Sequence, residues 1–61
     1  MKKITIYFDN EHTLSVDLDE KEVNKVIEWF EGSVSVYKLV TSIRTYYIAK
    51  EHIRHINVST L

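Results

Sequence analysis

Two short runs of alternating apolar and polar residues at the start of the chain restrict its fold most strongly. A period of two is typical of a strand that buries one face. Two such runs joined by the polar segment 9–12 predict a β-hairpin, with Asn10 in the turn as the residue expected to take a positive φ angle. The apolar positions of the two runs are Ile4, Ile6 and Phe8, then Leu14, Val16 and Leu18.

The next segment has the period of a helix, predicted over residues 20–31. Asp19 is the expected N-cap, with Glu22 three positions on as in a capping box, and Gly32 is expected to end the helix in a left-handed conformation. The stripe that should pack on the hairpin consists of Val23, Val26, Ile27 and Phe30. Trp29 lies beside this stripe, so it either seals the edge of the core or is exposed as an interface residue.

Beyond Gly32 the chain is rich in strand-forming residues, with strands predicted at 33–40, 45–49 and 53–58. The connection at 41–44 lacks Gly, Asn and Pro, so residues 34–49 form either a hairpin or one long bent strand. The predicted fold class is therefore α+β with the order β-β-α-β-β-β, in which one helix packs on one face of an antiparallel sheet. Residues 1–61 are expected to form a single domain.

The small size of the chain favours self-association. A domain of 61 residues buries only about 60% of the surface of its unfolded form, and this one has no cysteine for a disulfide. We therefore expect a homo-oligomer. The sequence contains neither an apolar run of membrane-spanning length nor a signal-peptide pattern, so we expect a cytoplasmic protein without a membrane partner.

Charge is unevenly distributed, because residues 9–31 carry eight acids against two lysines. This distribution disfavours a general nucleic-acid binder, which usually has a strong basic excess. Glu22 and Glu28 are candidates for contact with a basic partner surface. Helix capping and a solvated helix face explain the same acids without a partner.

Tyrosines provide the strongest indication of binding. Tyr7, Tyr37 and Tyr46 all lie on predicted strands, and we expect Tyr7 and some of the others on the sheet face opposite the helix. Tyrosine combines rigid contact area with a polar tip, which suits a protein interface, although stacked bases could use the same face. The candidate partner-binding residues are Trp29, Tyr7, Tyr37, Tyr46, Glu22 and Glu28.

Catalytic and metal chemistry have little support in the sequence. His52 and His55 are three residues apart, a spacing that would converge on a helix but diverges on a strand. The turn acids Asp9 and Glu11 lack the enclosed pocket that a general base needs. We expect no enzyme activity, no catalytic residue, no metal site and no cofactor.

Two segments of the chain, KITIYFDNEHTLSVDL and TYYIAKEHIRHINV, resemble small accessory proteins of phages and prophages from low-GC Gram-positive bacteria. The likeness consists of a hairpin, a helix and a tyrosine-containing strand that leads into the final strand. Some proteins of this kind inhibit host proteins, including defence systems. The resemblance implies a non-enzymatic module that binds or inhibits another protein; the alternative is a small nucleic-acid-binding protein that uses a tyrosine-bearing sheet face.

Overall fold

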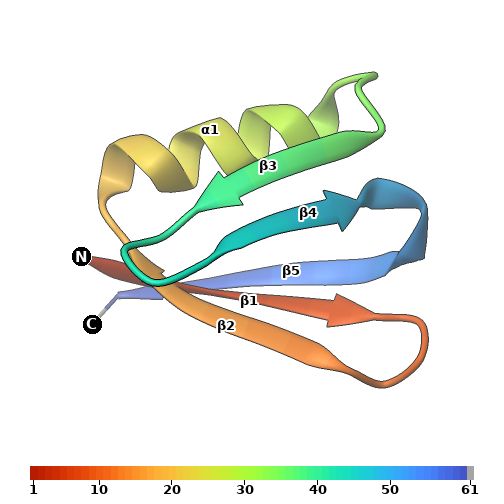
Figure 1. The fold of residues 1–61 in the computed structure, drawn as a ribbon, viewed down its shortest axis with the longest axis horizontal. Coiled ribbons are helices and arrows are strands. Elements are labelled where there is room, and N and C mark those ends of the chain that lie inside the picture. The colour runs from red at the N-terminus through yellow and green to blue at the C-terminus, as the bar shows by residue number, and fades with distance from the viewer. Residues whose placement is uncertain (61) are drawn as a thin grey trace.

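The computed structural model describes residues 1–60, which form five strands, one α-helix and one 3₁₀ turn (Figure 1). The order and the class confirm the predicted small α+β fold. The elements are β1 (Lys2–Phe8), β2 (Thr13–Leu18), α1 (Glu20–Glu31), β3 (Val36–Val40), β4 (Thr45–Ala49), η1 (Lys50–His52) and β5 (Ile53–Thr60).

The strands divide between two antiparallel sheets, a division that the sequence does not indicate. One sheet has the order β2-β1-β5, and the other is the β3–β4 hairpin alone. The hairpin turn closes without Gly, because the Thr41 N–H donates to the Arg44 carbonyl at 2.7 Å and the Arg44 N–H donates to Thr41 Oγ1 at 3.0 Å. Residues 34–49 therefore contain a hairpin and not one long strand.

The β1–β2 turn and the end of α1 each correct one expectation. The positive φ belongs to Glu11, at 69°, and Asn10 instead accepts a hydrogen bond through Oδ1 from the His12 N–H at 3.2 Å. Asp19 is the N-cap as expected and accepts from the Glu22 N–H at 2.8 Å. Gly32 is extended, with φ −91°, and a Cβ there would lie 3.2 Å from the Glu28 carbonyl oxygen. Close backbone approach, not a left-handed angle, explains this glycine.

A β-bulge in β5 turns two isoleucines toward the core. In a regular strand, Ile53 and Ile56 would point to opposite faces. Here Ile56 pairs with Ile6 while Ile53 pairs with Phe8, which leaves Arg54 as the extra residue of the bulge. Both isoleucines consequently pack against the core.

The core lies where α1 meets the inner faces of both sheets. Its buried side chains are Ile4, Ile6, Leu18, Val23, Val26, Trp29, Leu39 and Ile48. Trp29 is only 8% exposed, whereas Ile27 and Phe30 pack against the core but are half-buried, so the helix buries Trp29 more deeply than the second half of the expected stripe. The reason is the second sheet, because β3 packs beside the helix and places the Tyr37 ring 5.3 Å from that of Trp29.

Trp29 should therefore contribute more to stability than Phe30. We expect Trp29→Ala to lower the free energy of unfolding by about 3–5 kcal/mol, a large share of the total for a domain of this size. Phe30→Ala should cost clearly less, because that ring already contacts solvent. Urea denaturation followed by far-UV circular dichroism measures the free energy of unfolding of both variants. Equal decreases in the two variants would contradict the assignment of Trp29 to the core.

Candidate functional site

The six candidate residues lie in four separate places, so the expected tyrosine face does not exist. Glu22, Trp29 and Tyr37 come together between α1 and β3. Tyr46 lines a pocket, Tyr7 lies on the outer face of the three-stranded sheet, and Glu28 is exposed on the helix. The division of the strands between two sheets is the physical cause, because it gives the tyrosines no common surface.

The group formed by Glu22, Trp29 and Tyr37 holds the helix to β3. The Tyr37 hydroxyl donates to the Glu22 carboxylate, and Lys50 Nζ lies 5.3 Å from the Trp29 ring while donating to the Gly32 carbonyl at 2.6 Å. Within residues 1–60 the buried Trp29 Nε1 has no hydrogen-bond partner. Burial, reinforced by the hydrogen bond and by the negative charge of Glu22, raises the pKa of Tyr37 from 10.0 to about 12. These contacts are internal, so the three residues support the fold.

Tyr37→Phe tests this link through pH. At about pH 8 we expect the variant to be less stable than the parent by about 1 kcal/mol, because the Glu22 carboxylate loses its donor. The folded state holds the Tyr37 proton more tightly than the unfolded state, since the pKa of this hydroxyl rises from 10.0 to about 12 on folding. The stabilisation is thus present below pH 10.0 and is lost as the pH rises through about 12.

The gap in stability between parent and Tyr37→Phe should consequently narrow across that alkaline range, as measured by urea denaturation at several pH values. Tyr47→Phe is the matched control, because its ring is exposed and it should show no such gap. A gap independent of pH would contradict the role of the Tyr37 proton.

A second surface is the outer face of the β3–β4 hairpin, which we call the hairpin face. Opposing residues of an antiparallel pair share one face, and the register places Val36 opposite Ala49, Lys38 opposite Tyr47, and Val40 opposite Thr45. Val34 precedes β3, and Ile43 lies in the turn. The large apolar residues of this face, Val36, Val40 and Tyr47, are 49% to 70% exposed, and the adjoining Val34 and Ile43 are 62% and 83% exposed.

The sequence interpretation missed these residues because both faces of β3 look alike in composition. Tyr37 and Leu39 alternate with Val36 and Val40, so the pattern does not tell which pair is buried. The one available signal was Lys38, which shares the face of the two valines and marks it as the solvent side. Residues 33–49 also contain Lys38 and Arg44 but no acid, so this surface is apolar and mildly basic.

The outer face of the three-stranded sheet is polar by contrast. Tyr7 stacks on His55, with ring centres 4.2 Å apart, and Thr5 Oγ1 lies 3.2 Å from Ser15 Oγ. Lys3 and Asp17 are paired in register on the same face. This face is therefore a polar surface with one aromatic pair, in which His55 is exposed and Tyr7 is half-buried.

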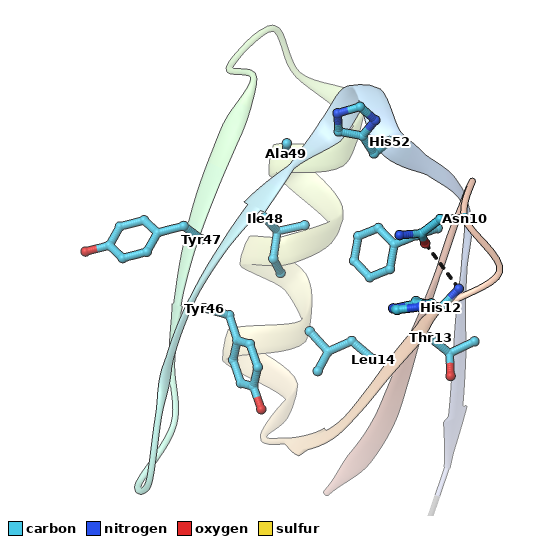
Figure 2. A pocket seen from close by; sticks show the side chains of 10 residues that line it. Asn10, His12, Thr13, Leu14, Tyr46, Tyr47, Ile48, Ala49 and His52 are labelled. Atoms are coloured by element: carbon cyan, nitrogen blue, oxygen red, sulfur yellow. Dashed lines mark hydrogen bonds between the residues drawn. The ribbon is translucent and has the colours of Figure 1, made fainter.

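A hollow of about 390 Å³ lies between β4 and the β1–β2 turn. Figure 2 shows Leu14, Tyr46 and Ile48 pointing into it, whereas Tyr47 points away. Asn10 and His12 extend toward the hollow from the turn, and His52 lines it from η1. The hollow thus has an apolar interior and a polar mouth.

The histidines are in different settings. His52 lines the hollow and has Nε2 3.5 Å from the Glu51 carboxylate, whereas His55 stacks on Tyr7. Within the described part of the chain, no three His, Cys, Asp or Glu side chains are grouped so that they could hold a metal ion. No helix within residues 1–60 combines the length and the apolar character needed to cross a membrane.

No protein-family model, curated protein or solved structure matches this chain.

Proposed function

We propose that this chain is a small non-enzymatic protein-binding module that acts through the hairpin face. The observation that supports the proposal is the concentration of exposed apolar side chains on one hairpin. Of the seven strongly exposed large hydrophobic residues in the part of the chain described, five lie between Val34 and Tyr47. Soluble proteins seldom leave apolar side chains gathered in this way unless a partner covers them.

The form of the surface also suits binding. The valines and Tyr47 project from a hydrogen-bonded hairpin, so little conformational freedom is lost when a partner orders them. Tyrosine is enriched among the residues that dominate interface energies. The long side chain of Lys38 can lie along apolar surface while its ammonium group reaches a partner carboxylate or water.

The partner we propose is another protein, with a second copy of this chain as the first one to test. A stable interface covers about 800 Å² of each partner, which is nearly a fifth of the 4443 Å² surface of this chain. Covering the hairpin face in a dimer would add apolar burial to a domain whose own core is small. The resemblance to phage accessory proteins favours a cytoplasmic inhibitor of a host protein, including a defence protein.

Replacing Val36 and Val40 together by Thr tests the hairpin face. Threonine keeps the size and the strand preference of valine, so the fold should persist while the surface loses apolar character. We expect self-association at micromolar concentration in the parent protein and a dissociation constant at least about tenfold higher in the double variant. Sedimentation equilibrium measures the dissociation constant of self-association for both proteins.

Val58→Thr is the matched control, because Val58 is also exposed but lies on β5, away from the hairpin face. It should leave association unchanged. A parent chain that remains monomeric at every concentration would contradict the homodimer. If Val58→Thr raised the dissociation constant as much as the double substitution does, the hairpin face would not be the interface.

A nucleic-acid-binding function is the second candidate, favoured by the Tyr7–His55 stack on the outer sheet face that also carries Lys3. Bases stack on such aromatic rings. If single-stranded DNA binds there, Tyr7→Ala should weaken binding and the affinity should fall steeply as salt rises. Fluorescence anisotropy with a labelled oligothymidylate measures both effects, and affinity that is absent at low salt would exclude this function.

A further inference from the structure

The hollow between the two sheets is fixed in shape by backbone hydrogen bonds. The β1–β2 turn is closed by the Phe8 N–H donating to the His12 carbonyl at 3.0 Å and by the Glu11 N–H donating to the Phe8 carbonyl at 3.1 Å. The Asp9 N–H then donates to the His52 carbonyl at 2.8 Å. The turn and η1, which supply the two sides of the mouth, are thereby tied to each other.

The interior of the hollow is apolar because the sheets separate here. Phe8, Leu14 and Tyr46 are half-buried and Ile48 is buried, and all four belong to the core or pack against it. The volume of about 390 Å³ falls within the usual range for small-molecule sites. An aromatic ring or a branched aliphatic group would fit the chemistry of these walls.

The mouth offers hydrogen-bond donors and no carboxylate. Among the described lining residues, the polar ones are Asn10, His12, Thr13, Tyr46, Tyr47 and His52. Asn10 Oδ1 is occupied by the His12 N–H, which leaves the side-chain NH₂ of Asn10 as a donor. An imidazole also carries at least one N–H in either protonation state. His52 Nε2 lies 3.5 Å from the Glu51 carboxylate, so His12 is the less encumbered imidazole.

We propose that this hollow binds a small organic carboxylate with an aromatic or branched apolar body. The body occupies the space between Leu14, Tyr46 and Ile48, and the carboxylate accepts hydrogen bonds from the Asn10 amide and the His12 imidazole. Charge-assisted hydrogen bonds of this kind are stronger than neutral ones, which favours a carboxylate over an uncharged acceptor. The site adjoins the hairpin face at Tyr47, which lines the hollow although its ring points away from it (Figure 2).

Phenylacetate is a suitable probe, with phenylacetamide and acetate as analogues that lack the charge or the ring. In a ¹H–¹⁵N correlation titration of the whole chain, we expect phenylacetate to shift the amide signals of residues 10–14 and 46–49 selectively. The dissociation constant of so small a ligand should be on the order of 1 mM. Phenylacetamide and acetate should each bind about fivefold more weakly or worse.

The three histidines provide matched variants, because all are exposed but only two line the hollow. His12→Ala should weaken phenylacetate binding about fivefold, His52→Ala should weaken it less, and His55→Ala should leave it unchanged. The spectrum of each variant reports at the same time whether the fold persists.

Three results would overturn the proposal. The first is the absence of localised shifts at about 20 mM phenylacetate, well above the expected dissociation constant. The second is equal affinity for phenylacetate and phenylacetamide, and the third is an equal effect of His12→Ala and His55→Ala.

Discussion

The packing of α1 against the inner faces of two separate sheets is the interaction on which the rest of the molecule depends. The β3–β4 hairpin shares no strand pairing with the β2-β1-β5 sheet. Side chains join the two sheets instead, above all Val23, Val26 and Trp29 of the helix. Because β3 lies beside the helix, the buried side of α1 turns toward Trp29 and away from Phe30. The contacts of Tyr37 with Glu22 and Trp29 belong to the same junction.

The same arrangement creates the exposed hairpin face. A two-stranded sheet can place only one of its faces against the single helix and the three-stranded sheet. Leu39 and Ile48 occupy that inner face and are buried, which forces Val36, Val40 and Tyr47 outward. In a larger domain a second helix would cover such a face, as layered architectures generally require. In this chain the apolar surface has no cover from residues 1–60, and that is the physical basis for assigning it to a partner.

The hollow has a related origin, because two sheets that are not hydrogen-bonded to each other diverge where the β1–β2 turn meets η1. The hydrogen bond from the Asp9 N–H to the His52 carbonyl holds that end in place. Apolar walls and polar groups therefore meet at one opening, although they come from distant parts of the sequence. The hairpin face, the hollow and the polar sheet face are thus three chemically different surfaces on one small scaffold.

Local order was readable from the sequence, because it depends on neighbouring residues. The alternation of Ile4, Ile6 and Phe8 predicted a strand, and Asp19 predicted the start of the helix. The element order followed from such signals, except that the connection at 41–44 left open whether residues 34–49 form a hairpin or one long strand. The sequence could not determine which of several side chains are buried and which are exposed. The local sequence allowed either a buried or an exposed setting for Trp29, for each face of β3 and for each of the four tyrosines. Only the division of the strands into two sheets decided between these settings. That division depends on packing between residues far apart in the chain, such as Ile6 and Ile48 of the one core, which no local pattern encodes.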